Sequence, residues 1–288
     1  MGALGLLSIG FAPGVLWLWL IVRRSRHRPE PRSLIVRTFL LGVLVAVPIV
    51  VAELLLGGRS EGASVGRMTP EAAAFSAFVV AGLCEELGKL WVVHATLRRT
   101  PYLDDPLRGL IFSSAVALGF SSIENVSYML QYGAAVILQR AILCTLGHVA
   151  FSALWGFALG WAQQHPRCSG LALSIGVLGA IGGHGLYDYF LMVGESRSGL
   201  LTFALCAALF FILLSRARSA SRSRHAAAPA LLSCRSCGSA APAGSNFCAR
   251  CGYRVPGAVG RHCGGCKAAL PTDARFCPSC GASVIRAA

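Results

Sequence analysis

Two adjacent carboxylates and an ammonium group interrupt an apolar stretch of this sequence. The segment LCEELGKLWVVH places Glu85, Glu86 and Lys89 in a run that is otherwise apolar over residues 72–97. Glu85 and Lys89 are four residues apart and share a helix face, where an ion pair lowers the cost of burying both. Glu86 is turned away by about 100°, so the two acids can serve different purposes. A carboxylate in such a setting can activate water as a general base.

More polar groups occur in three later apolar stretches. They are Glu124 and Asn125 in GFSSIENVSYML, His148 in TLGHVAFSALWG, and His184 in GGHGLYDYF. Tyr128 lies one turn after Glu124, and Asp188 lies one turn after His184. A carboxylate one turn from a histidine can hold the ring and fix its tautomer.

The composition is that of a membrane protein. Of the 288 residues, 55% are hydrophobic and 13% are charged, whereas soluble domains have about 25% charged residues. Stretches long enough to cross a bilayer as helices have the approximate bounds 3–22, 34–56, 72–97, 107–130, 134–161, 170–193 and 199–215. The sequence therefore predicts an all-α polytopic membrane protein with about seven transmembrane helices, followed by small cysteine-rich modules.

The arginines outside these stretches are distributed unevenly. Most follow the first, third, fifth and seventh stretches: Arg23, Arg24, Arg26, Arg28, Arg32, Arg98, Arg99, Arg108, Arg167, Arg216, Arg218, Arg222 and Arg224. The other loops contain Arg59, Arg67 and Arg197. The positive-inside rule then predicts a cell-membrane protein with its N-terminus outside and its C-terminal tail in the cytoplasm. Because much of the net charge of +14 reflects topology, it is poor support for nucleic-acid binding.

The polar groups are expected at similar depths in the bilayer. Glu85 and His148 lie near the middles of their stretches, and His184 lies about two residues past its middle. Glu124 lies roughly 9 Å further toward the outer face, at 1.5 Å per residue. An ionisable group at such depth costs roughly 2.5–3.5 kcal/mol on insertion scales and tends to mark function. We therefore expect these helices to share a water-filled cavity.

Eight of the twelve cysteines lie in a C-terminal repeat with a period of 29 residues. Each unit reads Cys-x2-Cys-x10-Cys-x2-Cys, formed first by Cys234, Cys237, Cys248 and Cys251 and then by Cys263, Cys266, Cys277 and Cys280. Four thiolates on two tight turns form the tetrahedral shell that suits zinc, and the metal would supply the folding energy of so short a unit. A disulfide framework is disfavoured in a reducing cytoplasm. We expect two structural zinc sites in modules that resemble the zinc-ribbon family.

The composition also predicts domain boundaries. Residues 1–215 form the transmembrane domain, 216–231 a flexible basic linker of Arg, Ser and Ala, 232–256 the first ribbon and 261–285 the second. A closed four-cysteine site has no open position for catalysis. The ribbons are therefore expected to regulate the protein or to dock a cytoplasmic protein partner, with nucleic acid as the other partner considered.

Four short motifs carry a family resemblance. EELGK, GFSSIEN, HVAFSALWG and HGLYDYF, in this order on successive helices, resemble the PrsW family of intramembrane proteases, distant relatives of the CAAX-prenyl and bacteriocin-processing proteases. The resemblance covers residues 1–215 and implies a hydrolase that cuts membrane-tethered proteins, such as an anti-sigma factor. By matching position it implies the following active residues: Glu85, Glu86, Glu124, His148 and His184. Lys89 matches the basic position of the first motif, while Asp188 stands where Asn is also common.

Two mechanisms are open for such a site. In the first, Glu124, His148 and His184 hold a catalytic zinc ion with water in the fourth position, and Glu85 or Glu86 is the general base. In the second, no metal binds, a carboxylate activates water and the histidines stabilise the oxyanion. In both versions the supporting residues are Lys89, Asn125, Tyr128 and Asp188.

Two other function classes also use polar groups within the membrane. An ion-coupled transporter commonly has internal repeats in its spans, and the spans of this sequence show none. A seven-span receptor or scaffold with a zinc-ribbon docking module needs no water-activating carboxylates. Arg37 and Arg140, near the ends of spans, are expected to extend to the membrane interface.

Overall fold

A computed structural model of the chain describes residues 2–23, 31–57, 68–98, 100, 102–226, 231–234, 236–238, 240–242, 251, 253, 261–262, 265–266 and 269–270. The chain forms two compact units, Met1–Ser223 and Arg224–Ala288.

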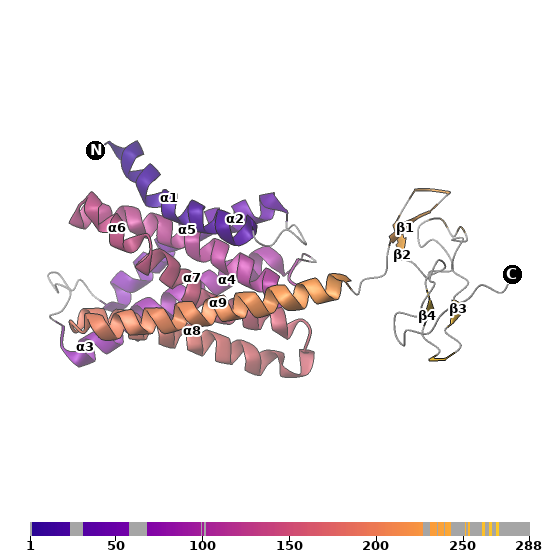
Figure 1. Ribbon diagram of the computed structural model, residues 1–288. Coiled ribbons are helices and arrows are strands. Elements are labelled where there is room, and N and C mark those ends of the chain that lie inside the picture. The colour runs from indigo at the N-terminus through magenta and orange to yellow at the C-terminus, as the bar shows by residue number, and fades with distance from the viewer. Residues whose placement is uncertain are drawn as a thin grey trace. The chain divides into compact units, whose positions relative to one another are not determined.

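The described part of the first unit is helical, as predicted (Figure 1). Its elements are α1 (Ala3–Arg23), α2 (Arg32–Gly57), α3 (Pro70–Ala74), η1 (Phe75–Leu83), α4 (Cys84–Leu97), α5 (Pro106–Tyr132), η2 (Ala134–Val136), α6 (Ile137–Arg140), α7 (Leu143–Ala162), η3 (Pro166–Cys168), α8 (Ser169–Met192) and α9 (Ser196–Ala226). Within the described ranges, six segments are long and apolar enough to cross a membrane: α1, α2, α5, α7, α8 with η3, and α9.

The third predicted span consists of three consecutive helical pieces rather than one helix. α3 begins after Thr69, whose side chain accepts a hydrogen bond from Ala72 N, the usual N-terminal cap. η1 is a wider π-helical segment, a form found often at functional sites. It packs on α8, where a Cβ on Gly185 would lie 2.4 Å from the ring of Phe78. This contact fixes the part of the chain that leads into the acids of α4.

Two other predicted boundaries differ from the structure. The fifth span was expected over 134–161, but α5 ends at Tyr132, before Gly133 with its φ of 88°, and α7 begins only at Leu143. The short helices η2 and α6 fill the interval. α9 continues to Ala226, so the first part of the expected basic linker, residues 216–231, is helical. Ala and Arg are good helix formers, so the basic composition does not end the helix.

α5 lies at the centre of the bundle and packs against α1, α2 and α7. In its most apolar stretch 94% of residues are buried, compared with 17% for α1. α5 begins where Asp105 Oδ1 accepts from Arg108 N at 2.9 Å. A Cβ on Gly109 would lie 2.0 Å from the carbonyl oxygen of Gly156, so the glycines allow α5 and α7 to approach closely. This packing places the polar residues of the two helices opposite one another.

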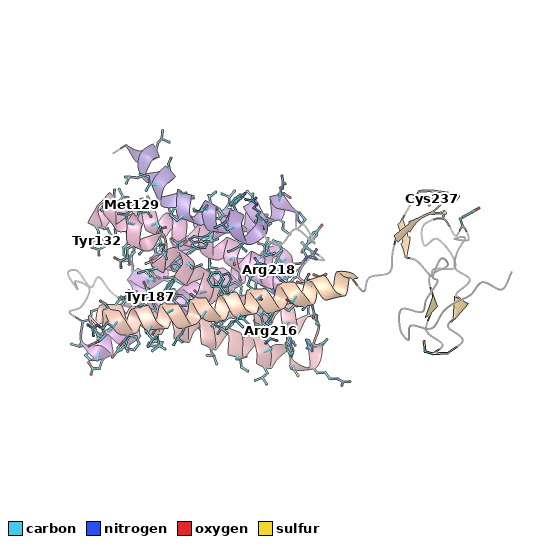
Figure 2. All side chains as sticks on the ribbon, viewed as in Figure 1. Met129, Tyr132, Tyr187, Arg216, Arg218 and Cys237 are labelled. Carbon is cyan, nitrogen blue, oxygen red and sulfur yellow. The ribbon has the colours of Figure 1, made fainter. Side chains whose placement is uncertain are left out.

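The two ends of the bundle differ in character. Met129 and Tyr132 of α5 lie toward one end, and Arg216 and Arg218 of α9 lie toward the other (Figure 2). The end with the α9 arginines is the one that the charge distribution predicts to be cytoplasmic.

The second unit contains short antiparallel hairpins. β1 (Leu231–Ser233) pairs with β2 (Ala240–Pro242), and β3 (Arg261–His262) pairs with β4 (Ala269–Leu270). Between β1 and β2 the chain turns at Gly238, whose φ is 71° and whose N–H donates to the carbonyl oxygen of Cys234. This tight turn carries the first cysteine pair.

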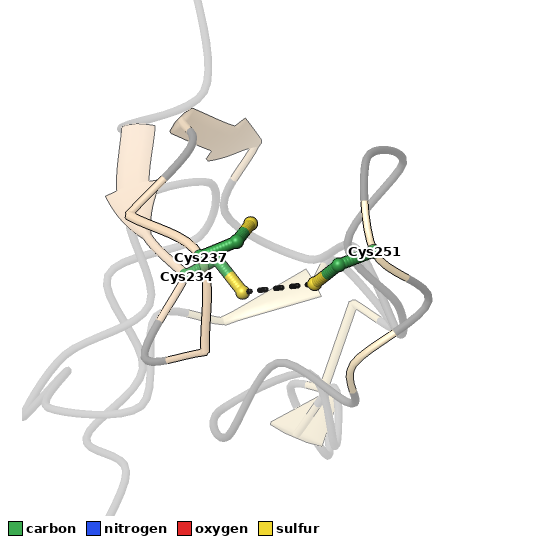
Figure 3. Close-up of side chains that lie close together, drawn as sticks. All are labelled: Cys234, Cys237 and Cys251. Carbon is green, nitrogen blue, oxygen red and sulfur yellow. Dashed lines mark hydrogen bonds between the residues drawn. The ribbon is translucent and has the colours of Figure 1, made fainter.

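Three cysteines of the first ribbon lie together (Figure 3). Cys234, Cys237 and Cys251 each offer a sulfur atom, and these atoms lie within 4.8 Å of one another. The Cys234 and Cys251 sulfur atoms are 3.7 Å apart, close to the separation of about 3.8 Å expected for two thiolates on tetrahedral zinc. The predicted ligands Cys248, Cys263, Cys277 and Cys280 lie outside the described residues, and Cys266 is exposed.

Candidate active site

The predicted acids and histidines meet inside the helix bundle. α4 contributes Glu85 and Glu86, α7 contributes His148 and α8 contributes His184. One ligand atom from each lies within 4.8 Å of the others, and all four residues are buried. Four residues from three helices distant in sequence thus form one polar cluster, which we call the acid–imidazole cluster.

Lys89 lies within this cluster and is fully buried. Its Nζ atom donates to Glu85 Oε2 at 2.8 Å and to Glu86 Oε1 at 2.9 Å, which confirms the predicted ion pair with Glu85. The same Nζ lies 3.1 Å from His148 Nδ1. An ammonium group can only donate, so His148 Nδ1 is the acceptor and the ring proton is on Nε2. That nitrogen then donates to Glu124 Oε2 at 2.7 Å.

Glu86 has donors on both carboxylate oxygens. Oε1 accepts from Lys89 and lies 3.1 Å from His184 Nδ1, while Oε2 accepts from Ser152 Oγ at 2.8 Å and from Trp155 Nε1 at 2.9 Å. The residue is fully buried. A carboxylate so surrounded is stabilised as an anion, but it has little capacity left to take a proton from water.

Glu85 has a different environment. Its Oε2 accepts from Lys89 and lies 3.6 Å from His148 Nδ1 and 3.8 Å from His184 Nε2. Among the described residues, no hydrogen bond engages its Oε1 atom. Glu85 is therefore the acid of the pair that lies beside both imidazole rings through one oxygen and keeps the other, Oε1, without a hydrogen bond among the described residues.

The remaining predicted residues surround the cluster. Asp188 Oδ2 lies 3.5 Å from His184 Nε2, as their spacing predicted. Glu124 contacts His148 and forms an ion pair with Arg140. Asn125 and Tyr128 contact Arg140 rather than the cluster itself. The side chains of Glu124 and Asp188 are 23% and 22% exposed, so the site is most open on their side.

Sequence reasoning missed three residues of the site. Ser152 and Trp155 follow His148 by four and seven positions, which places all three on one face of α7, so the spacing could have shown them. Arg140 was expected to extend to the membrane interface, and this expectation was wrong. It is 5% exposed because its guanidinium group turns inward to polar partners.

The family comparison decides what kind of protein this is. A family model described as PrsW family intramembrane metalloprotease matches residues 30–215. The chain belongs to the PrsW family. A second family model, described as double zinc ribbon, matches residues 234–281.

Several proteins named Protease PrsW are similar to this PrsW chain. The one from Geobacillus kaustophilus is 32% identical over 215 residues, which cover 75% of this chain and 92% of the relative. The one from Bacillus subtilis is 28% identical over 189 residues, 65% of this chain and 82% of the relative. The one from Clostridioides difficile is 29% identical over 204 residues, 66% of this chain and 80% of the relative. No solved structure matches the chain.

The chain is therefore a multi-pass membrane enzyme, an intramembrane protease of the PrsW family with a C-terminal zinc ribbon. The predicted family and enzyme class are confirmed, and the receptor and transporter alternatives are set aside. Its surroundings are the lipid bilayer, and its substrates are membrane-associated proteins.

The family description names a metalloprotease, and the donors of the acid–imidazole cluster fit a zinc ion. Catalytic zinc is held by three protein ligands, and tetrahedral geometry separates imidazole and carboxylate donors by about 3.3–3.5 Å. His148 Nδ1 and His184 Nε2 lie 3.6 and 3.8 Å from Glu85 Oε2. Glu124 Oε2 lies at hydrogen-bonding distance from His148 Nε2 instead. The predicted ligand set of Glu124, His148 and His184 stays a prediction.

Proposed function

We propose that this PrsW protein hydrolyses peptide bonds at the acid–imidazole cluster, with Glu85 as the general base. The observation that carries the proposal is the contrast between two neighbouring carboxylates. Glu86 has donors on both of its oxygens, whereas Glu85 lies beside the two imidazole rings through Oε2 and, among the described residues, has no hydrogen bond to its Oε1. Only the second arrangement leaves a carboxylate able to accept a proton from water.

Each residue of the cluster has a distinct task in this proposal. Glu85 takes a proton from water as the water oxygen forms its bond to the carbonyl carbon, and the carbonyl electron pair moves to oxygen. In a site without a metal, the second N–H of a protonated His184 would stabilise this oxyanion. Glu85 then passes its proton to the amide nitrogen as the carbon–nitrogen bond breaks. If zinc is bound, His148 and His184 would be ligands of the metal, which would polarise the carbonyl and activate the water in place of that N–H.

Glu86 and Lys89 hold this arrangement in place. Lys89 balances the charge of the two acids at the start of α4, and Glu86 links α4 to α7 and α8 through Trp155 and His184. Water would reach the cluster from the side of Glu124 and Asp188.

The topology follows from the same proposal. Residues 70–97 form a continuous helical run of about 40 Å at 1.5 Å per residue, enough to cross a bilayer. With the six segments above this makes seven crossings, so the two termini lie on opposite sides of the membrane in this proposal. We assign the N-terminus to the outside and the C-terminal ribbons to the cytoplasm. The arginine distribution supports this orientation through the positive-inside rule.

The ribbons serve a separate purpose in this proposal. We assign one structural zinc ion to each, over residues 232–256 and 261–285, and the 3.7 Å separation of the Cys234 and Cys251 sulfur atoms supports the first site. Because such sites are closed, the ribbons dock a cytoplasmic protein partner or regulate the protease. The substrate is a membrane-tethered protein of the anti-sigma-factor kind.

The test is cleavage of single-span proteins co-reconstituted with the full-length chain, alongside its zinc content. We expect Glu86→Gln, His148→Ala and His184→Ala to lose cleavage by about 100-fold or more while still inserting in the membrane. If the cluster holds zinc, His184→Ala should lose one equivalent of zinc and keep the ions of the ribbons. Normal turnover in all three variants would contradict the proposal.

A further inference from the structure

Arg140 is held in one position by three contacts. Its Nε donates to Asn125 Oδ1 at 2.9 Å, and its Nη2 lies 3.0 Å from Glu124 Oε2 in an ion pair. The guanidinium carbon lies 3.7 Å from the centre of the Tyr128 ring, a close cation–π contact. The side chain is 6% exposed. A cation that merely extended to the membrane interface would be free of such contacts.

The Asn125 side chain is itself fixed on two sides. A guanidinium group only donates, so the amide oxygen of Asn125 must face Arg140. The amide nitrogen then donates to Thr145 Oγ1 at 3.0 Å and to the carbonyl oxygen of Gly10 at 3.4 Å. Residues of α1, α5 and α7 thereby orient the group that receives Arg140 Nε.

The contacts of Arg140 lead directly to the acid–imidazole cluster. One oxygen atom, Glu124 Oε2, meets both the guanidinium group and His148 Nε2, at 3.0 and 2.7 Å. The guanidinium group holds that oxygen where it accepts the Nε2 proton. His148 is then left with Nδ1 as its acceptor, directed at Lys89 and 3.6 Å from Glu85. The tautomer and orientation of His148 thus depend on Arg140 through Glu124.

We propose that Arg140 is a positioning residue for peptide hydrolysis, acting through Glu124 on His148. The inference rests on the proposed function of the acid–imidazole cluster. Lysine would keep the charge, but it lacks the planar fork that contacts an amide, a carboxylate and an aromatic face together. Conservative replacement should therefore disturb the orientation of His148 and leave substrate binding little changed.

The experiment uses the full-length chain with a single-span substrate and measures kcat and KM separately. We expect Arg140→Lys to lower kcat by about 10- to 100-fold, as for groups that orient active-site histidines, with little change in KM. If Arg140 acts through Glu124, the double variant Arg140→Lys/Glu124→Gln should have a kcat less than about threefold below that of Glu124→Gln alone. The matched control is Arg37→Lys, since Arg37 is exposed, and it should behave as the parent.

Other results would overturn the inference. A parental kcat in Arg140→Lys would overturn it. It would also be overturned if the fold-decrease in kcat of the double variant equalled the product of the fold-decreases of Arg140→Lys and Glu124→Gln. If Arg140→Lys does not fold, Asn125→Ala serves instead, because it keeps the ion pair and removes the Nε acceptor. A parental kcat in a folded Asn125→Ala protein would then overturn it.

Glu85→Gln, measured alongside, separates this inference from the proposed function. An inactive Glu85→Gln with a fully active Arg140→Lys refutes the role of Arg140 alone. A fully active Glu85→Gln refutes the assignment of Glu85 as the base.

Discussion

Replacing Lys89 by methionine should remove the cation on which the charge balance of the acid–imidazole cluster depends. The Lys89 side chain is fully buried and lies 2.8 Å from Glu85, 2.9 Å from Glu86 and 3.1 Å from His148. Removing one partner of a buried ion pair costs about 3–5 kcal/mol because the remaining charge is left uncompensated. At about 2–4 °C for each kcal/mol in a chain of this size, the thermal transition should fall by about 6–20 °C.

The assay is thermal unfolding of the purified protein in detergent, with cleavage measured on the same samples. Arg98→Met removes an exposed cation and is the matched control, expected to unfold as the parent does. Adding Glu85→Gln to Lys89→Met removes an uncompensated charge and should recover part of the lost stability without restoring cleavage. An unchanged transition in Lys89→Met would refute the reasoning, because the ammonium group could not then be the counter-charge of both acids.

Three more predictions concern other contacts. Trp155→Phe removes one hydrogen-bond donor from Glu86 and should lower kcat by about 10-fold or more with KM unchanged. A parental kcat would show that this hydrogen bond does not position Glu86. Gly185→Ala brings a Cβ within 2.4 Å of the Phe78 ring of η1 and should lower the unfolding temperature. Gly182→Ala is the control, because a Cβ there meets nothing within 4 Å, and it should unfold as the parent does. Equal shifts in the two variants would contradict this packing. Cys234→Ser should lower the zinc content of the full-length chain by one equivalent in elemental analysis, because a structural site needs all four thiolates. An unchanged zinc content would exclude Cys234 as a ligand.

Local spacing was enough to predict the pairs that lie on a single helix. Glu85 with Lys89 and His184 with Asp188 are each four residues apart, and the structure has both pairs in contact. Helix periodicity fixes such neighbours whatever the rest of the fold does. The order of the spans and the membrane class also followed from composition, because hydrocarbon thickness sets the length of each apolar stretch.

Partners that lie on different helices could not be read in the same way. The contact of Glu86 with Trp155 joins residues 69 positions apart, and it depends on how α4 packs against α7 in the bundle. Nothing in the composition near Arg140 signals that the predicted fifth span is interrupted there. Hydrophobicity reports that a segment can enter the bilayer, but tertiary hydrogen bonds decide where its helix begins.

The most direct test of the whole account compares two glutamates of the full-length chain in single-turnover cleavage. Glu85 belongs to the acid–imidazole cluster, whereas Glu71 is exposed on α3. We predict that Glu85→Gln remains folded and lowers the cleavage rate by about 100-fold or more, and that Glu71→Gln cleaves as the parent does. Cleavage by folded Glu85→Gln at the parental rate would contradict the claim that this carboxylate activates the attacking water.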